Sequence, residues 1–172
     1  MKDNIYRVAE LDMKIQFAES TTNNEQLIES FEPFRVSALK GSILFHLTVD
    51  DNTRPYPKEK RERIRNFDTG SGHTIVDKLD DGGYQFIIRD IYDADCALVI
   101  ANADFSECRC ALNGNMNMRR FGLNNTLMLI YAFASCPYDT LMLHASLVRQ
   151  NGYGYAFIAK SGTGKSTHVS LW

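Results

Sequence analysis

The sequence lacks an excess of positive charge, a long apolar run and a secretion signal. Its 172 residues include 19 lysines and arginines against 21 aspartates and glutamates, a formal net charge of −2. This balance excludes a globally basic nucleic-acid-binding protein. The longest uninterrupted apolar run, 127–134, is far shorter than the roughly 20 residues that span a bilayer. The first residues contain no apolar segment typical of a signal peptide. We therefore expect neither a nucleic-acid partner nor a membrane partner.

Cysteine is scarce, and its four positions are Cys96, Cys108, Cys110 and Cys136. Without a secretion signal, these cysteines are expected to be free thiols rather than a disulfide framework. Their spacing lacks the C-x₂₋₄-C pairs typical of zinc sites. Residues two apart on a strand share a face, so Cys108 and Cys110 fit a core. We predict a cytoplasmic protein without a cysteine-based metal site.

The composition is that of a globular protein, with 44% hydrophobic and 23% charged residues. At roughly 100–200 residues per domain, the length predicts one domain, or one domain and part of another. No internal repeat is visible. Strand-like patterns cover 42–49, and two hairpins are predicted over 73–89 and 97–112. We predict an α+β protein whose residues 1–115 form an antiparallel β-rich domain for recognition or regulation.

One polar stretch interrupts these strand patterns. Residues 51–68 include two prolines and several basic side chains, with Glu59 and Glu62 among them. Such a stretch is typical of a solvated loop or an exposed helix face. A binding site for a polyanion is the alternative.

The pattern changes after Gly114, where we place the start of a second region, 116–172. Asn124 or Asn125 is expected to cap a helix that ends before Pro137. This helix is apolar almost all round, so it should be buried between layers or at an interface. It would permit a homo-oligomer. Two strands then follow, over 141–148 and 153–159, joined by an Asn-Gly turn.

The second of these strands leads directly into Lys160-Ser161-Gly162-Thr163-Gly164-Lys165-Ser166-Thr167. A strand, a glycine-rich turn and a helix start are the expected context of a phosphate-binding P-loop. The glycines let successive backbone N–H groups point at one anion, and the following helix presents its positive end. The full pattern, G-x-x-x-x-G-K-[ST], has a glycine where this chain has Ala159. Alanine there would cost on the order of 1–2 kcal/mol if φ is positive, and almost nothing if φ is negative.

This stretch, with the preceding Leu143-His144-Ala145-Ser146-Leu147-Val148, resembles the start of the kinase domain of HPr kinase/phosphorylase. It is also similar to the phosphate loop of ATP-dependent phosphoenolpyruvate carboxykinase, which shares that catalytic core. Those families carry G-x-S-G-x-G-K-[ST], in which Ser161 fits the internal serine. They also place an antiparallel hairpin before the loop. The resemblance covers roughly residues 141–172 and, more loosely, the region before them.

The resemblance implies ATP or GTP and Mg²⁺ as ligands. Phosphate binding is implied for Ser161, Gly162, Thr163, Gly164, Lys165, Ser166 and Thr167. Lys165 would contact the β- and γ-phosphates, and the Ser166 hydroxyl would bind Mg²⁺. Thr163 would contribute mainly its backbone N–H. His144 takes the place of a family histidine near the reacting phosphate, and an ordinary structural histidine is the equal alternative.

Only seven residues follow Lys165, whereas the family's metal-binding and catalytic acids lie on later strands. We therefore expect the truncated start of a kinase-like domain, unable to transfer phosphate alone. The leading hypothesis is part of a nucleotide-dependent phosphotransferase whose acceptor, a small molecule, peptide or protein, is unknown. The alternative is a non-catalytic binding or sensor module with a degenerate phosphate loop.

Overall fold

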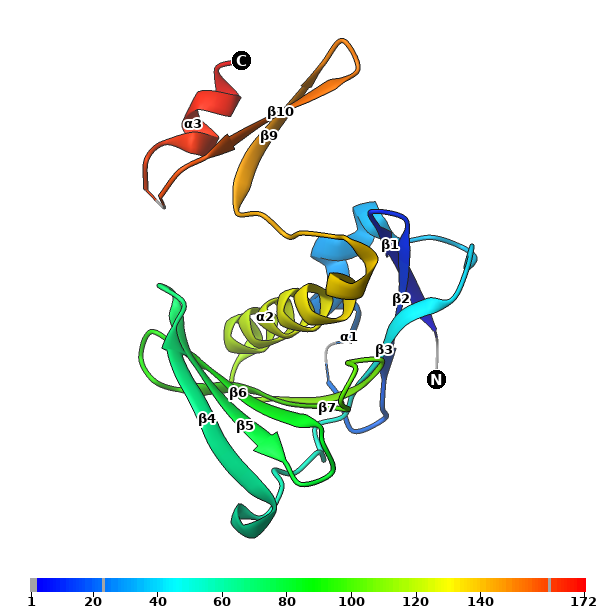
Figure 1. The fold of residues 1–172 in the computed structure, drawn as a ribbon, viewed down its shortest axis with the longest axis vertical. Helices are drawn as coiled ribbons and strands as arrows, with labels where there is room; N and C mark the ends of the chain where they lie inside the picture. The colour runs from blue at the N-terminus through cyan, green and yellow to red at the C-terminus, as the bar shows by residue number, and fades with distance from the viewer. Residues whose placement is uncertain (1–2, 23, 161) are drawn as a thin grey trace. The chain divides into compact units, whose positions relative to one another are not determined.

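Eight strands form one sheet in the first part of the chain. The computed structural model describes residues 3–22, 24–160 and 162–172. The chain divides into two compact units, one ending at Thr140 and the other spanning Leu141–Trp172. Each unit is described by itself. The first is a mixed α+β unit dominated by its sheet (Figure 1).

The sheet is mixed rather than purely antiparallel. Its strand order is β1-β2-β3-β8-β7-β6-β5-β4. The strands are β1 (Asn4–Val8), β2 (Leu11–Phe17), β3 (Ile43–Val49), β4 (Arg61–Asp68), β5 (Gly72–Leu79), β6 (Tyr84–Asp90), β7 (Asp95–Ala101) and β8 (Glu107–Leu112). The two predicted hairpins are confirmed as β5–β6 and β7–β8. The prediction of a wholly antiparallel domain is wrong, because β3 pairs in parallel with both β2 and β8.

The connections explain these two parallel pairs. The short helix α1 (Asn24–Ile28) and the 3₁₀ helix η1 (Glu29–Phe34) lie between β2 and β3, and parallel neighbours require such a crossover. After β3 the chain continues to β4 at the far edge, and the antiparallel meander then returns strand by strand until β8 meets β3.

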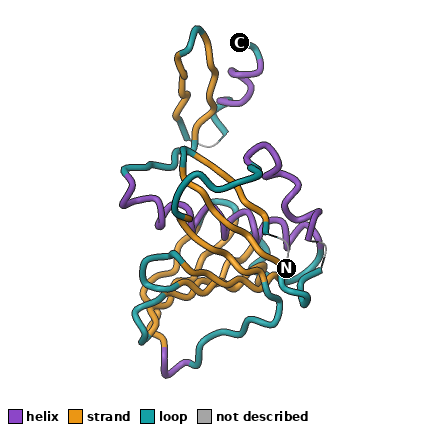
Figure 2. Tube along the Cα trace, turned by 90° about the vertical axis from the view of Figure 1, so that its right-hand side faces the viewer, coloured by secondary structure: helices purple, strands orange, loops and turns teal. Residues whose placement is uncertain are grey.

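Helix α2 (Met116–Ser135) covers one face of the sheet (Figures 1 and 2). It begins earlier than predicted, because the Asn115 side chain accepts hydrogen bonds from the N–H groups of Asn117 and Met118, at 3.0 and 3.1 Å. Asn124 and Asn125 therefore lie inside the helix rather than at its cap. The 3₁₀ helix η3 (Cys136–Tyr138) follows. Within the described ranges, no helix combines the length and apolar character needed to cross a membrane.

The core lies between α2 and this face of the sheet. Fully buried members include Phe45, Val99, Leu123 and Ile130. Gly122 permits the close approach, since a Cβ there would lie 2.7 Å from the carbonyl oxygen of Cys96. Helix α2 therefore belongs to the first unit. The division after Thr140 thus differs from the boundary at residue 115 expected from the sequence.

The polar stretch 51–68 is only partly the loop that the sequence predicts. Its second half is strand β4, preceded by the 3₁₀ helix η2 (Lys58–Lys60). β4 is an edge strand whose side chains are mostly exposed. The start of β4 is held by Asp77, a buried carboxylate that forms ion pairs with Arg61 and Arg63. The sequence does not predict this strand, because both faces of β4 are exposed to solvent and its residues therefore show no alternation of apolar and polar side chains.

The second unit contains a hairpin and a short helix. Strands β9 (Ala145–Gln150) and β10 (Tyr153–Ile158) are antiparallel, and α3 (Lys165–Ser170) follows. The predicted Asn-Gly turn is confirmed, with positive φ at Asn151 and Gly152. Ring contacts join the hairpin to the end of the chain, for example Tyr155 to Trp172 at 5.8 Å between centroids.

Candidate phosphate-binding loop

The predicted phosphate loop connects the end of β10 to the start of α3. Both flanking elements are present where the motif requires them. Of the predicted site residues, Ser161 lies outside the described residues. The other phosphate-binding candidates lie in one segment, 162–167, at the end of the hairpin opposite the Asn-Gly turn, and His144 lies outside this segment.

Two glycines give the loop its path. Gly162 and Gly164 have φ angles of 82° and 85°, in the left-handed region. Apart from the chain neighbours of each glycine, no described atom lies within 4 Å of a Cβ built on either residue. The glycines are therefore required by backbone conformation rather than by crowding. The space beside them is open, which leaves room for a ligand close to the backbone.

The φ angle of Ala159 is not positive. A glycine at this position would therefore gain nothing from its wider conformational freedom. The replacement of the motif's first glycine by Ala159 therefore costs almost no conformational energy. It gives no reason to regard the loop as degenerate.

The Lys165 side chain bends back over the loop. Its ammonium nitrogen, Nζ, donates to the carbonyl oxygens of Ala159 and Lys160 at 2.8 and 3.1 Å. The hydroxyl of Thr163 also donates to the Lys160 carbonyl, at 2.9 Å. These bonds hold the cation across the turn, and carbonyl groups leave its charge uncompensated. An anion in the loop would supply the missing charge.

Ser166, in the first turn of α3, presents an exposed hydroxyl. Its Oγ lies 3.4 Å from Oγ of Ser146 on β9. Thr167 is also exposed. Hydroxyl oxygens are hard ligands that suit Mg²⁺, an ion that usually keeps several waters and binds substrate phosphates as well. The donor set therefore fits a Mg²⁺ ion that arrives with a nucleotide, and Ser166 would hold it.

Ser146 is a residue that the sequence reasoning missed. It pairs with Phe157 in the hairpin, and this pairing follows once the turn is placed at Asn151-Gly152. The pairing of Ser146 with Phe157 could therefore have been predicted from the Asn-Gly turn. The position of α3 beside β9 could not.

His144 lies just before β9 rather than on it, because the strand begins at Ala145 and not at Leu141. It is exposed. Ala145 pairs with Ile158, the last residue of β10. His144 is therefore at the end of the hairpin from which the phosphate loop departs.

The charge of the second unit also suits an anionic ligand. Residues 141–172 contain Arg149, Lys160 and Lys165 but no aspartate or glutamate. Within the described part of the chain, no group of three or more histidine, cysteine, aspartate or glutamate side chains is arranged to hold a metal ion.

No family model, curated protein or solved structure matches this chain. The resemblance to HPr kinase/phosphorylase and to phosphoenolpyruvate carboxykinase thus depends on the motif and the hairpin alone.

Proposed function

We propose that the second unit binds the phosphate groups of ATP or GTP together with Mg²⁺, as part of a phosphotransferase of the HPr kinase or carboxykinase type. The observation that carries the proposal is the loop itself. Gly162 and Gly164 are left-handed, and the Lys165 ammonium lies across the turn on two carbonyl oxygens. Such a loop can offer N–H groups and one cation to a single anion.

Each residue would have a separate role. The loop N–H groups of 162–164 would surround a phosphate, and Lys165 would move from the carbonyl oxygens to the phosphate oxygens. Ser166 would donate its hydroxyl oxygen to Mg²⁺, whose chemistry is to neutralise charge on the transferred group. His144 would lie at the same end of the hairpin as the acceptor. The acceptor, whether a small molecule, peptide or protein, is not part of the proposal.

The proposal also places the protein in the cytoplasm, where Mg-ATP is abundant and thiols stay reduced. The four cysteines are free, and three of them are buried. A homo-oligomer would use exposed apolar side chains of α2 such as Met128 and Phe133, which are 56% and 53% exposed.

Isothermal titration of the whole chain with Mg-ATP and Mg-GTP tests the proposal. Lys165→Ala should weaken binding by about 10- to 100-fold, the value of a hydrogen-bonded charge. Lys160→Ala is the matched control, because it removes the same charge from the same loop. It should change Kd by less than about threefold. Equal losses in the two variants, or no binding by the unmodified chain at millimolar nucleotide, would contradict the proposal.

A further inference from the structure

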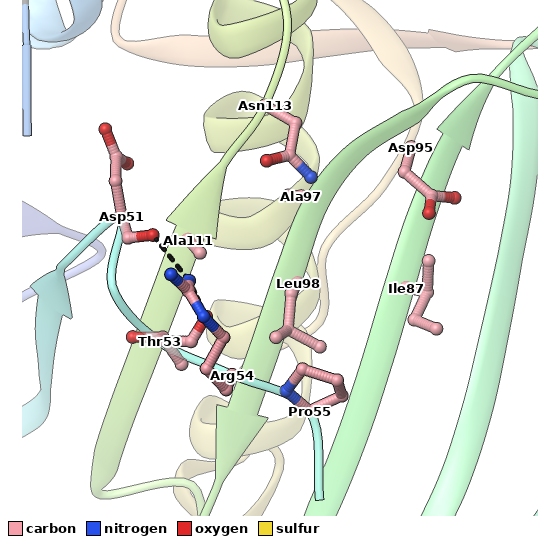
Figure 3. A pocket seen from close by; sticks show the side chains of 10 residues that line it. All are labelled: Asp51, Thr53, Arg54, Pro55, Ile87, Asp95, Ala97, Leu98, Ala111 and Asn113. Carbon is pink, nitrogen blue, oxygen red and sulfur yellow. Dashed lines mark hydrogen bonds between the residues drawn. The ribbon is translucent and has the colours of Figure 1, made fainter.

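A cavity of about 210 Å³ lies on the first unit, between residues 51–55 and the strands β6, β7 and β8. All of its lining residues belong to the first unit. Thr53, Arg54 and Pro55 form one wall (Figure 3). Ile87, Leu98 and Ala111 provide apolar surface opposite them. The cavity has about the volume that one small ring requires, since an engineered cavity of about 150 Å³ holds benzene.

The segment that covers this cavity is fixed at both ends. At one end, Asp51 accepts hydrogen bonds from Arg119 at 2.8 Å and from the Leu112 N–H at 3.2 Å. At the other end, the Tyr56 N–H donates to the Gln85 side chain at 2.8 Å. The cavity is therefore formed before any ligand binds, which removes an ordering cost from binding.

The carboxylates that line the cavity already have cationic partners. Asp51 pairs with Arg119. Asp95 pairs with Arg89 at 2.6 Å. Arg89 also contacts Asp93, at 3.2 Å, so the charge of Asp95 is only partly compensated, whereas Asp51 is paired with Arg119.

Arg54, in contrast, has no carboxylate partner within ion-pair distance among the described residues. Its guanidinium donates only to the carbonyl oxygens of Asp51 and Thr53, at 3.1 and 3.3 Å (Figure 3). Arg54 is therefore a cation of the cavity wall that can take a carboxylate partner without breaking an ion pair.

Asp50 is a nearby carboxylate with which Arg54 forms no ion pair. Its pKa is lowered first by hydrogen bonds from the Ser20 hydroxyl and the Asn52 N–H, and further by the charges of Arg109 and Arg54. Arg54 thus acts on Asp50 through space, without an ion pair that a ligand would have to break. Asp50 itself does not line the cavity.

We propose that this cavity binds a small organic anion, a carboxylate with an apolar body of about one ring. The body would lie against Leu98 and Ala111, which are 9% and 5% exposed. The carboxylate would take the Arg54 guanidinium from its two carbonyl partners. The hydrogen bonds from Arg54 to neutral carbonyl groups would then be replaced by a bidentate, charge-assisted pair with the ligand carboxylate.

Ligand-observed NMR and calorimetry with benzoate as the probe test this site in the whole chain at pH 7. Benzoate should bind with a Kd on the order of 1 mM. Benzyl alcohol, which keeps the ring without the charge, and acetate, which keeps the charge without the ring, should each bind about tenfold more weakly.

Two variants and a control locate the binding. Arg54→Gln should weaken benzoate about tenfold. Ala111→Leu should abolish binding by filling the cavity. Arg65→Gln, on the exposed edge strand, should leave binding unchanged. If Ala111→Leu fails to fold, the surface variant Arg54→Gln still decides. Equal affinity for benzoate and benzyl alcohol, equal losses in Arg54→Gln and Arg65→Gln, or no saturable binding would each overturn the proposal. None of these outcomes depends on nucleotide binding.

Discussion

The two units of this chain are built in opposite ways. The first buries a continuous core, and Phe45, Leu47, Val49 and Leu123 have no exposed surface. In the second, most described side chains are exposed, and Tyr153 and Leu171 reach 71% and 82%. The first unit also carries every aspartate and glutamate of the chain, whereas the second has only cationic charges.

The difference shows where each conformation is specified. In the first unit the packing of α2 on the sheet decides the structure. In the second, positions with positive φ decide it, at Asn151, Gly152, Gly162 and Gly164. A loop that closes on an anion needs its backbone shape more than it needs a buried core. Regions with few buried contacts are also those that open most easily.

The largest expected effect contrasts one substitution in each unit. Phe45→Ala should lower the free energy of unfolding of the first unit by about 3–5 kcal/mol, because it leaves a cavity in the core. Leu147→Ala, at a side chain that is 64% exposed, should change stability by less than about 0.5 kcal/mol. Urea unfolding measures both.

Two signals separate the units in that experiment. Circular dichroism is dominated by α2 in the first unit, and the single tryptophan, Trp172, reports on the second through its contact with Tyr155. Phe45→Ala should shift the dichroism transition. A larger loss in Leu147→Ala than in Phe45→Ala would show that the comparison is wrong.

The next effect is the pH dependence of the first unit. Burial raises the pKa of Asp77, but hydrogen bonds from Arg63 and Arg61 outweigh it and lower the pKa below its usual value. The unfolded chain then binds a proton that the folded chain does not. The stabilisation is therefore complete above about pH 4, the ordinary pKa of aspartate, and is lost as pH falls through the lowered value.

Asp77→Asn should accordingly cost about 2–3 kcal/mol at pH 7, and this cost should shrink below pH 4. This cost lies below the roughly 3–5 kcal/mol typical of a broken buried ion pair, because the Arg63 side chain is half exposed. Asp80→Asn, at an exposed residue of the next turn, is the control and should be nearly neutral. A cost that does not vary between pH 7 and pH 2.5 would exclude the ion pairs as its origin.

The sequence predicted the strands with regular alternation and strong turn signals. The β5–β6 hairpin follows Asp-Gly-type turn chemistry, and β3 has the preferred apolar residues. It did not predict that β3 lies between two parallel partners, because pairing across distant segments leaves no local mark. Nor did it place the start of α2 at Asn115, since several asparagines compete as caps.

The loop could be predicted in more detail than the fold around it. Gly162, Gly164 and Lys165 lie where the motif places them, because glycine conformation is local. The contact between Ser166 and Ser146 required the packing of α3 on β9. The cavity beside Arg54 could not be predicted from the sequence, because its lining residues come from a loop and three strands that are far apart in the chain.

The smallest expected effect tests whether the second unit is specified locally. Gly152→Ala places a Cβ at φ 83° in open space, so its cost is backbone strain alone, about 1 kcal/mol. Amide hydrogen exchange should then accelerate about fivefold across β9 and β10. It should stay unchanged in α2.

Gly154→Ala is the matched control two residues later. Its φ is not positive, and its Cβ would make an ordinary 3.4 Å contact with Leu147. Equal acceleration in both variants would mean that loss of glycine in general, rather than the left-handed turn, controls the hairpin that leads to the phosphate loop.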